Sequence, residues 1–357
     1  RARRGCTDDR RRLGAVWEAQ VTSGLTIRPY EAGDEAGILQ TFNLVFREVC
    51  GPDYVDRTLA QWRWAYPENP AGHRISLAVA DDGTVASQYA GMPMRYDTPW
   101  GEQLLIHCVD SMTHPRWRQG LKAKSLFVET CMPFWDHSRE IGDALFYGFP
   151  VDAAYRIGKR YLKYEMMRVI DFLVRDRALG ALAPPSGVVV ERVEAVPTDV
   201  AGLHAAVRED KPFLLRRDHG YLDWRYVQNP ARGDYELWTA RRGGALCGLM
   251  VLKPGSGLAP DACTIADWAA PEADVEAADA LLAKAVARQQ EEQKQRLMTV
   301  FPPWSHEHRH LVQRGFVETP SATWLQRRLI HNVCKAEITP EFLSEQWWYT
   351  LGDSDLA

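Results

Sequence analysis

The stretch from Leu104 to Phe127 reads LLIHCVDSMTHPRWRQGLKAKSLF. Its apolar first part predicts a strand, Arg118 and Gly120 lie in the loop that follows, and a helical pattern begins near Lys122. The first N–H groups of a helix have no intrahelical partner, and the helix dipole adds positive charge there. A basic loop opening a helix therefore suits an anion such as a pyrophosphate. An ordinary strand–loop–helix connection with a basic surface is the alternative.

A segment upstream of this stretch occurs twice in the chain. Trp64–Pro70 reads WAYPENP and aligns with Trp224–Pro230, WRYVQNP, at an offset of 160 residues. After each copy we expect a hairpin, a strand that closes on Asp110 or Asp267, a helix and a late strand. This ordered succession predicts two copies of one mixed α/β unit.

The repeat predicts the organisation of the chain. Residues 1–22 are a basic segment, interpreted as a solvated tail rather than a binder of an acidic partner, and the missing initial Met suggests a piece of a longer chain. Pro184, Pro185 and Gly187 mark a break between the two units. We therefore expect a first domain over 23–180, a linker over 181–190, a second domain over 191–330 and a C-terminal extension over 331–357.

Composition narrows the function classes. The 357 residues are 46% hydrophobic and 25% charged, with a net charge of −4, which excludes wholesale disorder and argues against a general nucleic-acid binder. No apolar run approaches the ~18 residues of a membrane span. Seven scattered cysteines without a CxxC pair argue against a disulfide framework or a cysteine zinc site and favour a reducing, cytoplasmic location.

The loop after the Leu104 strand resembles motif A of the GNAT superfamily, the acyl-coenzyme A-dependent N-acyltransferases. That motif reads Arg/Gln-x-x-Gly-x-Gly/Ala, and this chain has RQGLKA over 118–123, with Leu121 in the slot of the middle glycine. The WRYVQNP copy and the ending YTLGDSD over 349–355 are similar to the tandem two-domain members. The resemblance implies two GNAT-like domains, each a central mixed, mostly antiparallel sheet flanked by helices, with a degenerate second repeat.

The resemblance also implies one site for acetyl-CoA or another acyl-CoA, in the first half. The family's fourth strand splays from the fifth, and the pantetheine arm pairs with the exposed backbone of the fourth, here Ser111, Met112 and Thr113. The pyrophosphate would meet Arg118 and the N–H groups of Gln119, Gly120, Leu121, Lys122 and Ala123. The second half continues after Asp267 with WAAPEAD, which is acidic and lacks glycine, so it should repel a pyrophosphate and shape the acceptor side instead.

Family members often use a carboxylate as base and a tyrosine as acid, and proton transfer at both groups is what attack on a thioester needs. Asp110 is the best base candidate, with a structural carboxylate as the alternative. Tyr155 is the best acid candidate, with a packed aromatic ring as the alternative. By strand parity His107 should point away from Asp110 and serve the core. Glu48 could line the acceptor pocket, although a surface role is the simpler interpretation.

The resemblance implies an enzyme that moves an acetyl or other acyl group from coenzyme A to a primary amine of a small-molecule acceptor, by direct attack in a ternary complex. The alternative is a repurposed module, non-catalytic or acting on an acyl carrier protein or on an oxygen or sulfur acceptor. No nucleic-acid, membrane or metal partner is expected. The His-Glu-x-x-His pattern of His306, Glu307 and His310 resembles a zinc motif, but we interpret it as a solvated helix start.

Overall fold

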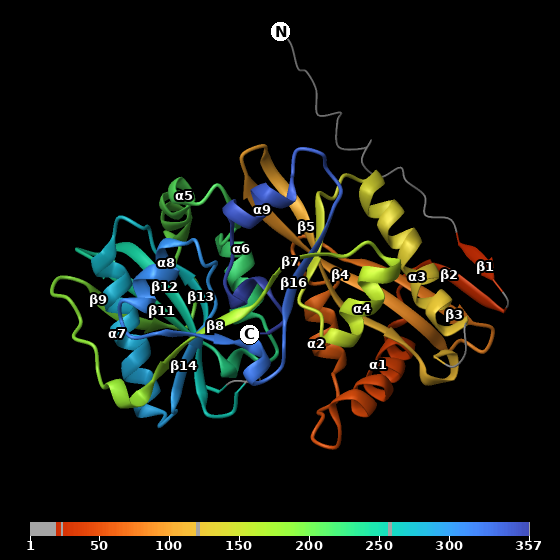
Figure 1. Cartoon of the computed structure of the whole chain (residues 1–357), viewed down its shortest axis with the longest axis horizontal. Coiled ribbons are helices and arrows are strands. Elements are labelled where there is room, and N and C mark those ends of the chain that lie inside the picture. The colour runs from red at the N-terminus through yellow and green to blue at the C-terminus, as the bar shows by residue number, and fades with distance from the viewer. Residues whose placement is uncertain (1–18, 23, 119–121, 256–258, 357) are drawn as a thin grey trace, which may run out of the picture.

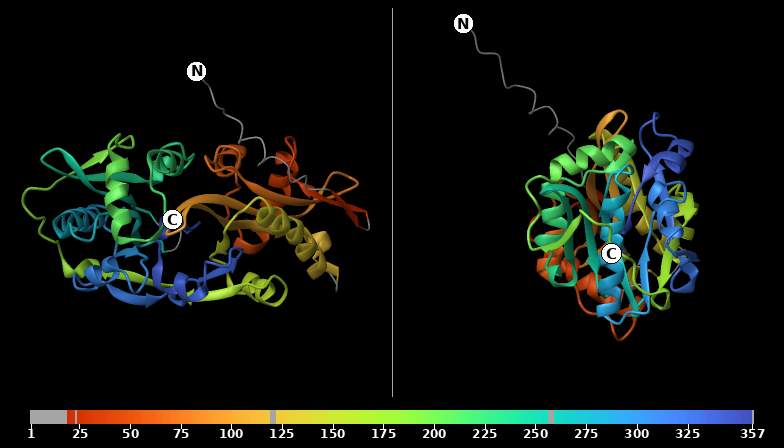
Figure 2. Two further views of the ribbon diagram at one scale, coloured as in Figure 1. Left: turned by 90° about the horizontal axis from the view of Figure 1, so that it is seen from above. Right: turned by 90° about the vertical axis from the view of Figure 1, so that its left-hand side faces the viewer.

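The structure is a computed structural model that describes residues 19–22, 24–118, 122–255 and 259–356, with the backbone alone over 122–125. Two halves, each built on its own sheet, lie side by side (Figures 1 and 2). The C-terminal end of the chain lies between them, in the middle of the molecule. The described part of the chain has no helix long and apolar enough to cross a membrane.

The first sheet is built around the long hairpin that the sequence predicts. β3 (Arg74–Ala80), β4 (Val85–Thr98) and β5 (Gly101–Thr113) are antiparallel neighbours, and β6 (Leu145–Gly148) joins β5 in parallel. The order is β1-β2-β3-β4-β5-β6-β16-β7, with β10 paired to β4 and β17 paired to β10. The remaining bounds are β1 Gln20–Thr22, β2 Leu25–Pro29, β7 Glu165–Val169, β10 Phe213–Leu215, β16 Arg328–Val333 and β17 Trp347–Trp348.

The second sheet repeats the arrangement. Its order is β15-β8-β14-β13-β12-β11-β9, and only the β13–β14 pair is parallel. The bounds are β8 Asp171–Asp176, β9 Val189–Val193, β11 Glu236–Arg242, β12 Ala245–Lys253, β13 Ala262–Ala269, β14 Arg296–Thr299 and β15 Val317–Pro320. Two mixed, mostly antiparallel sheets flanked by helices confirm the predicted fold class.

The halves exchange one strand each. β8 follows β7 directly in the chain but pairs with β14 and β15 of the second sheet. β16 comes from the second half of the sequence and lies between β6 and β7 of the first sheet. The predicted boundaries at 180 and 330 follow the order of the chain, whereas the pairing of β8 and β16 crosses them.

Helices cover the faces of both sheets (Figure 1). Their bounds are α1 Glu35–Cys50, α2 Leu59–Ala65, α3 Lys122–Glu140, α4 Asp152–Tyr161, α5 Val200–Asp210, α6 His219–Leu222, α7 Val275–Glu291, α8 His306–Val312 and α9 Pro340–Gln346. α3 contains Pro133 and continues past it to Glu140. Proline removes one backbone hydrogen bond, but Phe134 and Trp135, just beyond it, are buried, and their packing holds the next turns.

Candidate active site

β5 and β6 separate along their length. They pair only from Leu105–Leu145 to His107–Tyr147, so beyond His107 the edge of β5 that faces β6 has no partner strand in the described chain. On its other edge β5 stays paired with β4 as far as Thr113. The Met112 carbonyl accepts from Ser87 of β4, so by alternation the backbone groups of Ser111 and Thr113 are the ones on the open edge.

A bulge interrupts β5 at the start of this open edge. The register with β4 shifts between Gln88 and Ala90, and Asp110 takes a positive φ of 57°. Gln88 Nε2 donates to the Asp110 carbonyl at 2.9 Å and fixes the bulge. The extra residue resets the alternation of side chains. The prediction that His107 points away from Asp110 is therefore wrong. Asp355 lies 3.6 Å from His107 Nε2, and Asp355 and Asp110 both line the cavity described below.

The Asp110 carboxylate is held by two side chains from the segment before the hairpin. Arg57 and Tyr66 both donate to Oδ2, Tyr66 at 2.7 Å. No hydrogen bond to Oδ1 is among those of the described residues. Burial first, and Asp110 second, raise the pKa of Tyr66 well above its usual value, so its hydroxyl stays a donor. Asp110 is thus fixed in orientation while its side chain stays 12% exposed.

A cavity of about 200 Å³ lies beside Asp110. An engineered cavity of about 150 Å³ binds benzene, so this space suits a small molecule. Both halves line it: Arg57, Trp64 and Asp110 from the first, and Arg225, Asn229 and Asp355 from the second. The repeated segments that begin at Trp64 and Trp224 therefore each contribute residues to the wall of this cavity.

The two repeated tryptophans meet at the junction of the halves. Their rings stack at 5.2 Å with an interplanar angle of 18°. Trp64 Nε1 donates to the Trp224 carbonyl at 2.7 Å, and Trp224 Nε1 donates to the Trp64 carbonyl at 2.8 Å. Equivalent residues that bond each other reciprocally mark a pseudo-two-fold relation between the halves. Trp224 is 2% exposed and packs in the core, whereas Trp64 both packs and lines the cavity.

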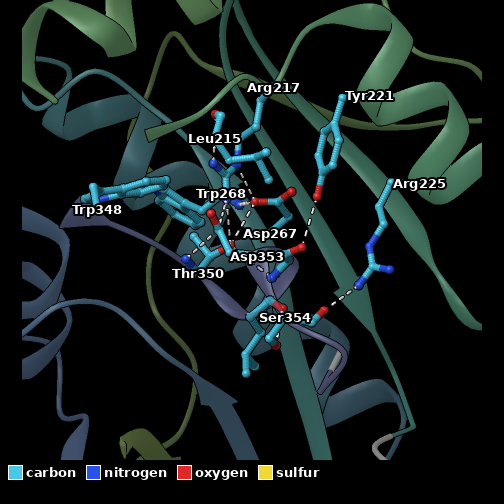
Figure 3. Close-up of polar contacts among 12 residues, drawn as sticks. Leu215, Arg217, Tyr221, Arg225, Asp267, Trp268, Trp348, Thr350, Asp353 and Ser354 are labelled. Carbon is cyan, nitrogen blue, oxygen red and sulfur yellow. Dashed lines mark hydrogen bonds and ion pairs between the residues drawn. The ribbon is translucent and has the colours of Figure 1, made fainter. Parts of the chain in front are cut away.

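The second half repeats the Arg–Tyr–Asp cluster in a closed form, and Figure 3 shows its Arg217 and Asp267. Arg217 Nε donates to Asp267 Oδ1 at 2.6 Å, and the Tyr226 hydroxyl donates to Asp267 Oδ2 at 2.9 Å. Arg57 and Arg217, like Tyr66 and Tyr226, keep the spacing of 160 residues. Arg217 is 1% exposed, so this copy is sealed from solvent.

The C-terminal segment Trp347–Leu356 seals it. Asp353 accepts from Arg217, and Thr350 Oγ1 donates to Asp267 at 3.0 Å (Figure 3). Gly352 passes so close that a Cβ there would stand 2.7 Å from the Asp267 carboxylate and the Tyr226 hydroxyl. The segment then continues to Asp355, which lines the cavity of the first half. The family-like ending of the chain is thus the cover of the second cluster.

The predicted coenzyme A residues are placed in part. Arg118 Nε donates to the Thr113 carbonyl at 2.5 Å, and Nη1 pairs with Glu48 at 3.0 Å, which ties the loop to the open end of β5. Lys122 and Ala123 begin α3, whereas Gln119, Gly120 and Leu121 lie outside the described residues. Glu48 is not among the residues that line the cavity.

Tyr155 lies on α4 and is 9% exposed. The Arg328 guanidinium covers its ring at 5.0 Å from the centroid. Tyr155 does not line the cavity that Asp110 lines, so the structure does not bring the two predicted catalytic residues together there.

The His-Glu-x-x-His pattern lies at the start of α8, but the prediction that this helix start is solvated is wrong. Glu307 and His310 are 4% and 5% exposed. Lys211 lies 3.0 Å from Glu307, Trp348 Nε1 donates to the same carboxylate at 2.9 Å, and His310 lies 3.1 Å from Asp279. Within the described ranges no three His, Cys, Asp or Glu side chains are grouped to hold a metal ion.

Sequence reasoning missed Arg57, Tyr66, Arg225 and Asp355. Extending the repeat alignment upstream of Trp64 would have found Arg57 and Arg217 at the same offset. The role of Asp355 had no such signal, because the ending of the chain has no counterpart in the first half.

Comparison with known proteins supports this architecture. No protein-family model and no curated protein sequence matches the chain. Among solved structures, a probable N-acyltransferase of unknown function from Enterococcus faecalis V583 matches with a TM-score of 0.63 at 12% identity, over 87% of this chain and 73% of that one. A tandem GNAT protein from the clavulanic acid biosynthesis pathway matches with a TM-score of 0.56 at 12% identity, over 87% of this chain and 99% of that one.

The chain has the tandem GNAT fold. A GCN5-related N-acetyltransferase from Anabaena variabilis ATCC 29413 matches it as well, with a TM-score of 0.59 at 12% identity over 87% of this chain and 73% of that one. Within this fold, the present chain carries one open and one covered Arg–Tyr–Asp cluster.

Proposed function

We propose that this protein is an acyl-CoA-dependent N-acyltransferase that acetylates, or otherwise acylates, a primary amine of a small molecule. The observation that carries the proposal is the open edge of β5 beyond His107, with the bulge at Asp110 at its start and the cavity beside it. An extended thioester arm and an amine need adjoining sites, and this edge and this cavity adjoin at Asp110.

The residues present fit an acyl-coenzyme A. The backbone groups of Ser111 and Thr113 on the open edge suit an extended amide chain, and Arg118 and the first N–H groups of α3 suit a pyrophosphate. Met112 lies between Ser111 and Thr113 on β5 and remains part of the proposed site for the pantetheine arm. The bound thioester supplies an activated acyl group, and the protein supplies position and polar N–H groups.

Asp110 is the proposed base. Its Oδ2 is occupied by Arg57 and Tyr66, which aim the carboxylate, and Oδ1 is left to accept a proton from the incoming amine. Tyr155 remains the proposed acid for the departing thiolate. Its ring is covered by Arg328 and does not line the acceptor cavity, so it would act from the coenzyme side.

Calorimetric titration with acetyl-CoA and with coenzyme A tests the proposal. We expect one site per chain, weakened about tenfold, ~1.4 kcal/mol, by Arg118→Ala, which loses its contacts to Thr113 and Glu48. Arg116→Ala is the matched control, because Arg116 belongs to the same loop but is 62% exposed and points to Asp82. Equal loss in both variants would remove Arg118 from the site.

The other outcomes of the titration and of a turnover assay distinguish an enzyme from a non-catalytic module and from a protein that uses another acyl donor. Binding followed by thiol release with an amine supports the enzyme. Binding without turnover on any amine, oxygen or sulfur acceptor favours a non-catalytic module. No binding of either compound at hundreds of micromolar overturns the coenzyme A proposal and leaves an acyl carrier protein as the donor to test.

A further inference from the structure

Arg225 is a buried cation in the cavity wall without a carboxylate partner. It is 4% exposed and lines the cavity. Its Nη2 donates to the Ser354 carbonyl at 2.7 Å, and its Nε has no partner among the described residues. No described carboxylate lies within the 4.0 Å that defines an ion pair with it. Figure 3 shows Arg225 at the edge of the covered cluster, where it donates to the Ser354 carbonyl.

The repeat makes this arginine a departure from symmetry. The residue at the same place in the first copy is Ala65, which also lines the cavity. The tryptophans just before these two residues stack on each other, so Ala65 and Arg225 enter the cavity wall from equivalent positions. A packing role that both halves share would not need a guanidinium on one side only.

None of the described carboxylates of the cavity forms an ion pair with Arg225, whose guanidinium lies over the Trp64 ring at 5.7 Å from the centroid. Arg57 is paired with Asp110, whereas Asp355 lies near His107 and has no arginine within ion-pair distance. Burying a charge without a counter-charge is costly, so such a residue is explained when a ligand supplies the partner. The lining of this space of about 200 Å³ thus holds one buried cation outside any ion pair, Arg225, and one carboxylate, Asp355, whose side chain is 53% exposed. A small zwitterion matches both.

We infer that the acceptor carries a carboxylate as well as its amine, as an amino acid or a small amino-acid derivative does, and that Arg225 binds the carboxylate. The inference rests on the proposed acyltransferase function. A guanidinium offers paired N–H donors that match the two oxygens of a carboxylate. With the carboxylate held there, the amine lies toward Asp110 and Asp355 on the other part of the wall.

Matched acceptor pairs test the inference. Thiol release from acetyl-CoA is measured with phenylalanine and phenethylamine, tyrosine and tyramine, lysine and cadaverine, and histidine and histamine. We expect the amino acid of at least one pair to exceed its amine about tenfold or more in kcat/KM. Arg225→Gln should abolish that preference by raising KM for the acid about tenfold, while the rate with the paired amine stays within about twofold. Arg225→Lys should restore part of it.

Arg232→Gln is the matched control, since Arg232 belongs to the next turn, is 56% exposed and is not in the cavity wall. It should leave the preference unchanged. If Arg225→Gln fails to fold, ligand-observed NMR of the same pairs on the wild-type protein decides, and binding of the amines as tight as the acids overturns the inference. Equal turnover of both members of every pair also overturns it. Failure of coenzyme A to bind is a separate result, which overturns the proposed function and leaves the NMR comparison valid.

Discussion

At the scale of single residues, Asp110 combines a strained backbone conformation with the proposed role as the base. A left-handed conformation is unfavourable for residues other than glycine, and such strain, of about 1–3 kcal/mol, collects at functional sites. Asparagine tolerates the same conformation, so Asp110→Asn should keep the bulge while removing the base. We expect kcat to fall about 10²–10⁴-fold with coenzyme A affinity unchanged, measured by thiol release and calorimetry.

Asp267→Asn is the matched variant for Asp110→Asn, because Asp267 holds the same place in the covered cluster. It is fully buried against Arg217, so its loss should lower the melting temperature rather than act through chemistry. Activity of Asp110→Asn within about threefold of the wild type would exclude a role as base.

Gly352 shows how closely the cover fits. A methyl group there would stand 2.7 Å from two oxygen atoms, well inside van der Waals contact. We expect Gly352→Ala to reduce the free energy of unfolding by about 1–3 kcal/mol, as overpacking does. Gly202→Ala is the control, since that glycine is exposed on α5 with nothing within 4 Å and should gain up to about 1 kcal/mol. Denaturant titration of both variants gives the two values, and equal effects would mean that the cover yields easily.

At the scale of elements, the paired segments that begin at Trp64 and Trp224 act as one unit. Each ring is both a stacking partner and a donor to the other backbone. Trp64→Phe and Trp224→Phe should therefore be non-additive, with a coupling of about 1 kcal/mol or more. The control pair is Trp64→Phe with Trp324→Phe, because Trp324 packs on Phe172 of the second sheet and shares no ring contact with Trp64. Additivity in both pairs would argue against the unit.

Asp97 of β4 joins the halves through charge. Its carboxylate accepts from Arg216 at 2.6 Å and lies 2.7 Å from His204 of α5. Burial raises the pKa of Asp97, but these hydrogen bonds lower it more, and the net pKa lies below the ordinary 3.8. A lowered carboxyl pKa stabilises the fold above pH ~4, and that contribution is lost as the pH falls through the folded value.

Asp97→Asn should consequently cost about 3 kcal/mol at pH 7, and the gap to the wild type should narrow at pH 3 and below. Melting temperatures across this range measure it. Asp82→Asn, at an exposed carboxylate beside Arg116, is the control and should change little. A gap that stays constant with pH would show that the variant acts by disturbing packing.

Many of the secondary-structure elements could be predicted from the sequence. The hairpins, the repeat and the two strands that close on Asp110 and Asp267 follow from local patterns. The bulge does not, because it depends on how β4 and β5 register. The partners of β8 and β16 do not either, since an alternating pattern marks a strand but not its neighbour. The site was found in part for the same reason: Asp110 lies in a local motif, whereas Arg225 and Asp355 reach the cavity only through tertiary packing.

At the scale of the whole molecule, the exchange of β8 and β16 makes each half incomplete alone. Without β16, β6 and β7 have no common neighbour, and without β8 the same holds for β14 and β15. The covered cluster adds to this, because Tyr96 of the first half donates to Asp353 at 2.8 Å. We expect one calorimetric transition in which the van't Hoff and calorimetric enthalpies agree.

The same dependence predicts the behaviour of separated halves. Residues 1–180 and 181–357, produced alone, should show no cooperative melting, because the separation leaves strand edges unpaired and takes the buried carboxylate of Asp97 away from His204 and Arg216. Produced together they should assemble, since each carries the strand that the other lacks, and coenzyme A binding should return with assembly. Two independent transitions in the intact chain, or a first half that melts cooperatively on its own, would mean that each domain is stable without the exchanged strand. The acceptor cavity would then form when two folded domains dock, rather than as part of folding.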